Sequence, residues 1–220
     1  MRKVIAATFM SLDGIMQAPG APEEDPTGGF KSGGWVFPYF DESASETLAE
    51  TFNAPFDLLL GRKTYEIFAA YWPHQGDSMI AERFNAVTKY VATSSREPLT
   101  WQKSVALRGN VAAEVARLKK EDGPDLLLQG SSELIQALLA NDVIDEFRLM
   151  VFPLLLGSGK RLFGKGTLPV AFKLVDSNVS TSGVTMSSYV RAGAVKTGSF
   201  AQEKPSDAEL ARREKIKKEG

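Results

Sequence analysis

Short apolar runs separated by turn residues recur along this chain and predict strands that are buried on both faces. Such runs lie at 3–10, 56–60, 89–93, 126–128 and 147–152, and a shorter run at 104–107 is typical of an edge strand. Between the last two buried runs, Leu134, Ile135, Leu138 and Leu139 form one apolar stripe, which predicts a helix over 131–140. A unit of strand, helix and strand this short is most easily built as a right-handed crossover that joins parallel strands.

Helices are predicted between most of the other runs. Apolar spacing and capping residues indicate helices over 41–53, 65–70, 78–87 and 110–120. The candidate caps are Asp41 or Ser43 for the first of these helices, Thr64 for the second and Asn110 for the last. The chain is therefore expected to form an α/β fold, in which a mixed, mostly parallel sheet is flanked by helices.

The C-terminal part departs from this alternation. Runs at 170–179 and 184–190 flank a Thr-Ser-Gly turn and predict an antiparallel hairpin at the end of the sheet. Residues 195–220 carry many charges and few apolar side chains, and Ser206 with Glu209 fits a capping box. We expect one domain over 1–194 and a tail over 195–220 that is either disordered or a solvated helix.

The composition argues against several classes of function. Lys+Arg 26 against Asp+Glu 27 leaves a formal charge of -1, so the chain lacks the basic field that nucleic-acid binding usually needs. Cys 0 and a single histidine, His74, argue against a thiolate or histidine metal centre, a cysteine nucleophile and a Ser-His-Asp triad. No apolar segment resembles a signal peptide or a membrane span, and we expect a cytoplasmic protein whose chemistry comes from a bound cofactor.

Three predicted strands end in small hydroxyl or glycine residues. The turns that follow them are Gly61, Arg62, Lys63 and Thr64; Ser94, Ser95 and Arg96; and Gly130, Ser131 and Ser132. Glycine permits close approach of a ligand, the first N–H groups of a helix attract anions, and the cations add positive charge. This repeated feature predicts a site for a phosphorylated ligand, although exposed basic residues on surface turns would have the same sequence.

Two further segments allow a structural or a functional interpretation. Asp13 precedes Gly14 in a turn after the first strand, where it either shapes the turn or lines a ligand site. The segment 33–40 holds an aromatic cluster that includes Trp35, Phe37 and Tyr39, after a glycine-rich loop over 17–34. This cluster is either buried core or a contact for a planar substrate or a second subunit.

Taken in order, these segments resemble the dihydrofolate-reductase-like superfamily, and in particular the reductase domain of the bifunctional riboflavin-biosynthesis deaminase-reductase and its single-domain bacterial relatives. The matching pieces are SLDG at 11–14, GRKTYE at 61–66, KYV at 89–91 with Ser94, QGS at 129–131, DE at 145–146, Pro153 and GSGKRLF at 157–163. Each motif is weak alone, and their order over 3–190 is specific.

The resemblance implies a homodimer with an NADPH site at the carboxyl ends of the strands. By position, Arg62, Lys63 and Thr64 would approach the pyrophosphate and adenosine side. Ser94, Ser95 and Arg96 would meet the ribose and its 2′-phosphate, and cations beside hydroxyl groups also favour NADPH over NADH. The pyrophosphate would lie on the third strand end, at Gly130, Ser131 and Ser132, and the cofactor-binding set also includes Gly157 and Gly159.

Hydride transfer to a C=N or C=O bond of a small heterocyclic or carbonyl substrate is the expected reaction. The carboxylate that dihydrofolate reductases carry on their first helix has no secure counterpart, so Asp13, Asp41, Glu42 and Glu46 are the candidates that polarise or protonate the substrate. The alternatives are a non-catalytic module that binds NADP(H), and an α/β domain that binds another phosphorylated ligand.

Overall fold

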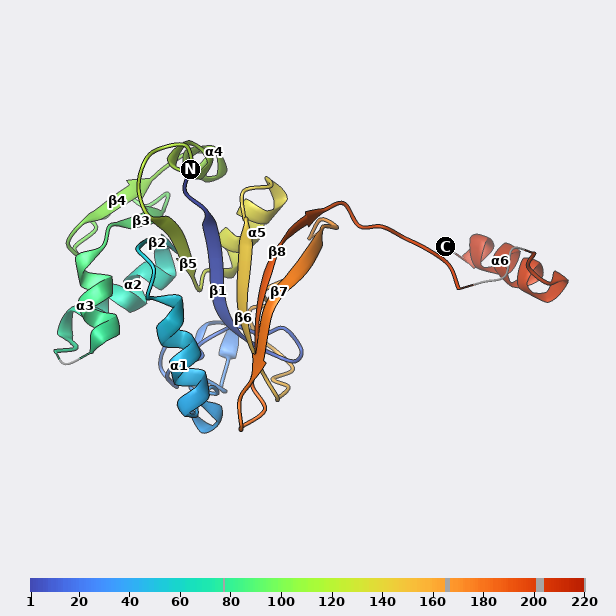
Figure 1. The fold of residues 1–220 in the computed structure, drawn as a ribbon, viewed down its shortest axis with the longest axis horizontal. Helices are drawn as coiled ribbons and strands as arrows, with labels where there is room; N and C mark the ends of the chain where they lie inside the picture. Colours follow the sequence, from blue (N-terminus) through green and yellow to red (C-terminus); the bar gives the residue numbers. More distant parts are fainter. Residues whose placement is uncertain (77, 165–166, 201–203, 220) are drawn as a thin grey trace.

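A single mixed sheet forms the centre of the molecule (Figure 1). The computed structural model describes residues 1–76, 78–164, 167–200 and 204–219. The strands are β1 (Val4–Ser11), β2 (Phe56–Gly61), β3 (Lys89–Ala92), β4 (Ser104–Leu107), β5 (Asp125–Gln129), β6 (Glu146–Phe152), β7 (Ala171–Val179) and β8 (Thr185–Gly193). Their order in the 8-stranded sheet is β4-β3-β2-β5-β1-β6-β8-β7.

The predicted topology is confirmed. Strands β1 to β6 pair in parallel, and β8 pairs antiparallel with both β6 and β7. Strand β4 is the edge strand that the short run at 104–107 predicted. The unit over 125–152 joins parallel strands, with β1 inserted between β5 and β6.

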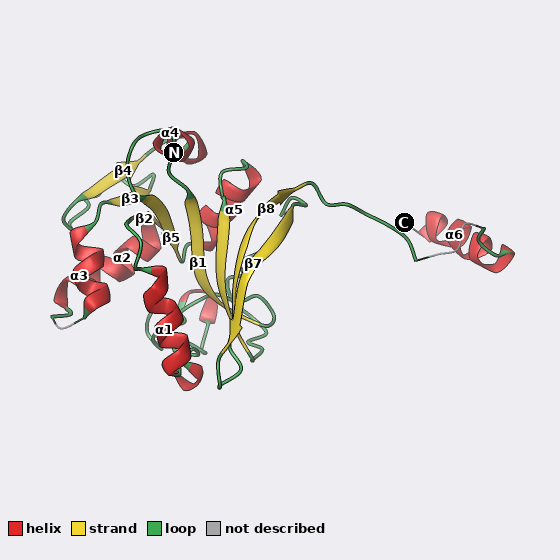
Figure 2. Cartoon of the chain, in the orientation of Figure 1, coloured by secondary structure: helices red, strands yellow, loops and turns green. Residues whose placement is uncertain are grey.

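Helices cover both faces of this sheet (Figure 2). They are α1 (Glu42–Thr51), α2 (Arg62–Tyr71), α3 (Met79–Ala86), α4 (Val111–Leu118) and α5 (Ser132–Ala140), with short 3-10 turns at Thr27–Gly29, Phe37–Tyr39 and Trp72–His74. Alternate residues of a strand point to opposite faces, so Val4 and Ala6 pack with α4 and α5, whereas Ile5 and Ala7 pack with residues of α1, α2 and α3. The sheet is thereby buried on both faces, as the apolar runs predicted.

Side chains cap three of these helices and fail to cap the other two. Asp41, Ser78 and Asn110 accept hydrogen bonds from the first turns of α1, α3 and α4. The predicted start of α2 is wrong, because Gly61 rather than Thr64 occupies its N-cap position and the helix begins three residues earlier than expected. Neither α2 nor α5 has a side-chain cap.

The charged tail forms a helix. Helix α6 (Asp207–Glu219) has no buried residue, and Figure 1 draws it away from the sheet. The Glu209 backbone N–H donates to the Ser206 hydroxyl, as the capping-box motif predicted. Within the described part of the tail, residues 207–219 form an exposed helix, and the division into a domain over 1–194 and a tail stays a prediction.

Lys89 is a buried cation without a carboxylate partner among the described residues. Its ammonium donates to the carbonyl oxygens of Asn85 and Gln102 at 2.9 and 3.1 Å, and lies 4.4 Å from the centre of the Trp101 ring. Burial, with a smaller contribution from Lys103, lowers the pKa of Lys89 from 10.5 to about 8.

This depressed pKa predicts a protein that becomes more stable in mild alkali. Between pH values near 8 and 10.5 the unfolded chain binds a proton at Lys89 that the folded chain has released. We expect the free energy of unfolding to rise by about 1 to 2 kcal/mol over that window, less than the full shift because solvent and carbonyl dipoles screen the charge. Urea unfolding of the wild type and of Lys89→Met across this window tests it, since the variant should lack the rise; a parallel rise in both proteins would contradict the assignment.

Candidate functional site

A large cleft opens at the carboxyl ends of β2, β3 and β5. These ends meet at one edge of the sheet because the three strands are parallel. The cleft has a volume of about 1350 Å³. Its polar wall consists of three segments, 61–64, 93–95 and 129–134, which follow the three strand ends. The structure thus brings together the glycine and hydroxyl turns at which the sequence predicted a phosphorylated ligand.

The two uncapped helices begin at this wall. Residues 61–64 and 130–134, which include the first turns of α2 and α5, line the cleft. The first N–H groups of a helix have no partner within the helix, and they form an anion site when no side chain caps them. The contrast with the capped α1, α3 and α4 therefore marks the starts of α2 and α5 as the place for a phosphate group.

A hydrogen-bonded junction holds the two helix starts together. The Ser131 hydroxyl accepts from the Gly61 backbone N–H at 2.9 Å and donates to the Thr64 hydroxyl at 2.7 Å. A Cβ atom on Gly61 would lie 3.0 Å from Ser131 Oγ, and one on Gly130 would lie 3.1 Å from Thr64 Cγ2. Gly130 also has a φ of +58°, so glycine is required there by both conformation and space. This junction fits a pyrophosphate, because it brings the uncapped starts of two helices together on the wall of the cleft.

The cationic side chains near this wall differ in whether they are already paired with a carboxylate. Arg62 donates to Glu66 at 2.6 Å and to Glu97 at 3.1 Å, and the contact with Glu66 raises the pKa of Arg62. Lys63 lines the cleft and is exposed. Arg108 donates to the Ser95 carbonyl oxygen beside the second polar segment. The charge of Arg62 is therefore largely neutralised, and Lys63 is the more available cation of the cleft lining. Arg108 does not itself line the cleft, but it is exposed and adjoins it through Ser95.

The opposite side of the cleft is apolar and partly acidic. Aromatic and aliphatic side chains between α1, α2 and α3 form the apolar part, which consists of Phe37, Phe40, Leu48, Phe52, Ile67, Phe68, Tyr71, Trp72, Ile80 and Phe84. The loop over 16–25 adds Glu24, whose pKa is raised by burial, and Asp25, which pairs with Lys160. This wall has room for the flat, apolar parts of a nucleotide or substrate.

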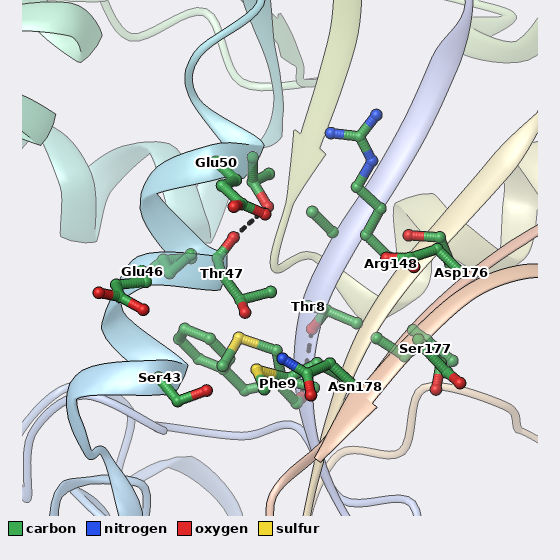
Figure 3. A pocket seen from close by; sticks show the side chains of 18 of the residues that line it. Thr8, Phe9, Ser43, Glu46, Thr47, Glu50, Arg148, Asp176, Ser177 and Asn178 are labelled. Atoms are coloured by element: carbon green, nitrogen blue, oxygen red, sulfur yellow. Dashed lines mark hydrogen bonds between the residues drawn. The ribbon is translucent and has the colours of Figure 1, made fainter. Parts of the chain in front are cut away.

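A second cavity of about 370 Å³ lies between α1 and the sheet (Figure 3). It shares Thr8, Phe9, Leu48 and Gln129 with the large cleft, so the two spaces meet at the carboxyl ends of β1 and β5. Polar side chains of α1 form one wall, and polar residues of β6, β7 and β8 form the other. A ligand here would adjoin a ligand in the large cleft.

A comparison with protein families decides the assignment. The model of the RibD C-terminal domain matches residues 2–186, nearly the whole sheet and all five helices around it. The chain belongs to the RibD C-terminal domain family. Two relatives from Bacillus subtilis (strain 168) match over similar lengths: uncharacterized protein YyaP is 26% identical over 86% of this chain and 94% of its own, and uncharacterized protein YwjB is 28% identical over 87% and 99%.

Solved structures share the fold of this RibD C-terminal domain. A protein from Shewanella sp. PV-4 that is named for riboflavin biosynthesis has a TM-score of 0.64 at 22% identity, over 86% of this chain and 99% of its own. Dihydrofolate reductase from Enterococcus faecalis, solved with NADP(H) and RAB-propyl, has a TM-score of 0.55 at 15% identity, over 86% and 96%. The dihydrofolate-reductase-like fold expected from the ordered motifs is confirmed.

Most predicted cofactor residues of this RibD C-terminal domain line the large cleft. They are Gly61, Arg62, Lys63, Thr64, Ser94, Ser95, Gly130, Ser131 and Ser132. Arg96, Gly157 and Gly159 do not line it. The Gly157 N–H donates to the Asp13 carboxylate at 2.8 Å, and a Cβ atom on Gly159 would collide with Ile15 at 2.8 Å, so these two glycines serve the packing of their loop rather than the cleft.

Some of the predicted catalytic carboxylates line a cavity and others do not. Asp13 accepts from the Ser11 hydroxyl at 2.6 Å and from the Leu156 and Gly157 N–H groups, and the Ser11 contact is the main cause of its lowered pKa. Asp41 caps α1 and accepts from Thr181 and Ser182, which lowers its pKa. Both carboxylates lie outside the two cavities and hold loops together, and a role for either in polarising or protonating a substrate stays a prediction that these positions do not support.

The two glutamates of α1 also have different positions. Glu42 lies in the first turn of the helix and lines neither cavity. Glu46 lines the second cavity, so it is the one predicted catalytic carboxylate that the structure brings next to a candidate substrate space. Its role there remains a prediction.

The aromatic cluster is mostly core. Trp35 is 7% exposed, donates its indole N–H to the Gln17 carbonyl oxygen at 2.8 Å and packs edge-on against Phe152 at 5.3 Å. Tyr39 also packs against Phe152, and neither Trp35 nor Tyr39 lines a cavity. Phe37 is 83% exposed and lines the large cleft. Of the three aromatic residues predicted to contact a substrate, Phe37 is therefore the one whose position agrees with that prediction.

Sequence reasoning missed Arg108 and Gln129. Arg108 follows β4, and because β4 is parallel to β3 it reaches the same edge of the sheet as Ser95; the parallel pairing of an edge strand was the signal that could have found it. Gln129 ends β5 and lines both cavities. Gln129 lines the second cavity because α1 lies opposite it, and the position of α1 relative to β5 cannot be inferred from the sequence around Gln129.

The described residues contain neither a membrane-spanning helix nor a metal-binding cluster. None of the described helices combines the length and the apolar character that crossing a bilayer requires. Within the same residues, His, Asp and Glu side chains do not gather in a group of three or more that could bind a metal ion. The cleft and the second cavity are therefore the features on which a function can be built.

Proposed function

We propose that this chain is an NADPH-dependent reductase that transfers hydride to a C=N or C=O bond of a small substrate. The observation that carries the proposal is the junction of two uncapped helix starts at Gly61, Thr64, Gly130 and Ser131, inside a cleft of about 1350 Å³. Membership of the RibD C-terminal domain family and the fold of a dihydrofolate reductase solved with NADP(H) support it, since both point to NADP-dependent reductases.

The residues present fit such a cofactor. The first turns of α2 and α5 would hold the pyrophosphate, and Ser94 and Ser95 at the end of β3 would meet the adenosine ribose. Bound NADPH would supply the hydride, so the protein's task is to position the two reactants and exclude water. The substrate would lie where the cleft and the second cavity meet, next to Thr8, Phe9 and Gln129.

Preference for NADPH over NADH is expected to depend on Arg108. Its guanidinium donates to the Ser95 carbonyl oxygen, and guanidinium groups bind phosphate oxygens well. We expect Arg108→Ala to weaken NADPH binding about tenfold and NADH binding less than twofold, because only NADPH carries the 2′-phosphate. Titrations that follow tryptophan fluorescence and are repeated by calorimetry measure both constants.

The matched control for this test is Arg117→Ala. Arg117 is also an exposed arginine, but it is paired with Glu114 and Glu121 near α4 and makes no contact with Ser95. Equal losses for the two cofactors in Arg108→Ala would contradict the 2′-phosphate contact. No binding of either cofactor to the wild type would overturn the proposed function, and binding without oxidation across pterins, flavin precursors and small carbonyls would favour a non-catalytic module.

The homodimer implied by the family resemblance is part of this proposal. Edge strand β7 exposes Leu174, Val175 and Val179 at 48%, 51% and 61%. An exposed strand edge with apolar side chains is a surface that natural proteins cover. This edge supports a dimer without assigning its geometry.

A further inference from the structure

Three apolar side chains line the large cleft without belonging to the core. They are Phe37, Ile67 and Tyr71, and none of them is a member of the three apolar clusters that the described residues form. Phe37 is 83% exposed and Tyr71 is 51% exposed. Apolar side chains inside a concave site gain free energy when an apolar ligand covers them. Protein packing thus leaves one side of the cleft open to an apolar ligand.

This apolar side lies away from the place proposed for the phosphates. Tyr71 is the last residue of α2, a helix of 10 residues. A helix rises 1.5 Å per residue, so Tyr71 lies about 13 Å along the axis from the helix start that would hold the pyrophosphate. The adenosine is proposed to lie at Ser94 and Ser95, beside the end of β3. The apolar side is therefore free for the substrate when a dinucleotide occupies the polar wall.

The apolar side suits a group without charge. Among the cationic side chains that line the cleft, Arg62 is paired with Glu66, and Lys63 lies on the polar wall. Lys160, which also lines the cleft, is paired with Asp25. An anionic group on the apolar side would lose hydration that the surrounding side chains cannot replace. The part of the substrate that lies here is therefore an uncharged hydrocarbon group.

A second observation, at Gln129, indicates the polar end of the substrate. The Nε2 atom of this side chain is buried without a hydrogen-bond partner among the described residues. Gln129 ends β5 and lines the cleft where it meets the second cavity. A buried N–H donor without a partner is costly, and such groups are normally satisfied by a ligand or water. The donor needs an acceptor, which a carbonyl oxygen provides and a protonated C=N nitrogen does not.

Apolar residues connect Gln129 with the uncovered side of the cleft. Phe9 and Leu48 line both cavities, as Gln129 does. The ring of Phe9 lies edge-on to the ring of Phe40, with 6.2 Å between their centres. Phe40 lines the cleft together with Phe37. The surface from the unpaired donor to Phe37 is thus largely apolar, so one ligand can have a polar end and an apolar body.

We propose that the substrate is an uncharged carbonyl compound with an apolar body. The body lies against Phe37, Ile67 and Tyr71, and the Gln129 Nε2–H donates to the carbonyl oxygen. This inference rests on the proposed function and narrows its reaction to reduction of a C=O bond. A phosphorylated or sugar-like substrate is excluded, because its anionic and hydroxyl groups would be buried against apolar side chains without partners.

The reaction needs no titratable side chain of the protein. For a ketone, the carbonyl carbon accepts a hydride, with its electron pair, from a reduced nicotinamide on the polar wall. The C=O π electrons move to the oxygen, which takes a proton from water. The products are a secondary alcohol, an oxidised nicotinamide and hydroxide. A hydrogen bond from Gln129 strengthens as the oxygen gains negative charge, and it thereby stabilises the transition state more than the bound ketone.

Four probes of related shape test this inference by calorimetric titration, with and without NADP⁺. They are 4-phenylbutan-2-one, its hydrocarbon isostere 2-methyl-4-phenylbut-1-ene, its carboxylate isostere 3-phenylpropanoate, and butan-2-one, which lacks the ring. We expect the wild type to bind the phenyl ketone at least about tenfold more tightly than butan-2-one, because only the former covers the apolar side. The hydrocarbon should bind about fivefold more weakly than the phenyl ketone, because it offers no acceptor. The carboxylate should also bind more weakly.

Two kinds of variant separate the two contacts. Ile67→Asn and Tyr71→Asn are each expected to weaken binding of the phenyl ketone about tenfold and to leave butan-2-one unchanged. Gln129→Met keeps the volume of the side chain and removes its donor, so it should bind the phenyl ketone and the hydrocarbon equally.

The matched controls are Met79→Asn and Gln102→Met. Met79 is 60% exposed on α3, Gln102 is exposed, and neither residue lines a cavity, so both variants should leave all four affinities unchanged. Equal binding of the two ketones, tighter binding of the carboxylate, or wild-type affinities in the cleft variants would each overturn the inference. Failure of NADPH to bind would overturn the proposed function instead, and the titrations without nucleotide would still measure the preference for the phenyl ketone.

Discussion

Replacing Arg2 by methionine is expected to lower the free energy of unfolding by about 3 to 5 kcal/mol. The Arg2 guanidinium is paired with the Asp57 carboxylate between the starts of β1 and β2, and the two side chains are 3% and 12% exposed. The same guanidinium donates to the Pro124 carbonyl oxygen and lies 5.4 Å from the centre of the Tyr90 ring. Removing it leaves a buried carboxylate with the Thr88 N–H, at 3.1 Å, as its remaining donor.

Urea unfolding measures this loss, and two further variants separate its causes. Arg117→Met breaks exposed ion pairs on α4 and should cost less than about 1 kcal/mol. Arg2→Met/Asp57→Leu removes both charges and should recover a large part of the loss, because the penalty comes from the unpaired carboxylate. A loss in Arg2→Met no larger than that in Arg117→Met would show that Asp57 is reached by solvent.

The sheet could be predicted from the sequence because its strands are buried on both faces. Runs such as Leu58 to Leu60 and Leu126 to Leu128 have no polar side, and short buried runs separated by helices leave parallel pairing as the natural arrangement. The hairpin of β7 and β8 carried its own turn signal. What could not be predicted was the start of α2, because its N-cap, Gly61, offers no capping side chain, and its N–H is bonded to Ser131, which is 70 residues away.

The polar wall of the cleft was also predictable, and the substrate side was not. Residues that follow parallel strands meet at one edge whatever the loops do, so the three strand ends could be grouped from sequence alone. Asp13 and Asp41 looked equally available for chemistry, yet each is used by backbone N–H groups and hydroxyls from the distant segments 156–157 and 181–182. Carboxylates near turns often accept hydrogen bonds from other loops. Only the positions of those loops in space show that Asp13 and Asp41 are used in this way and that Glu46 lines a cavity instead.

Gly130→Ala is expected to weaken NADPH binding by at least about tenfold while the protein still folds. The added Cβ atom would lie 3.1 Å from both Cγ2 and Oγ1 of Thr64, and Thr64 is held in place by its hydrogen bond from Ser131. Thr64 would have to move, which breaks the contact that joins the starts of α2 and α5. Since the pyrophosphate is proposed to lie on N–H groups of both helices, separating them removes donors from one side.

Gly193→Ala is the matched control for this prediction. Gly193, at the end of β8, also has a positive φ, +88° against +58° at Gly130, but a Cβ atom there meets nothing within 4 Å. Both variants should lose about 1 to 2 kcal/mol of stability from the left-handed backbone, so unfolding experiments measure the cost that they share. The fluorescence titration with NADPH then isolates the junction, because only Gly130→Ala disturbs Thr64 and Ser131. If both variants bind NADPH as the wild type does, the pyrophosphate does not lie at this junction.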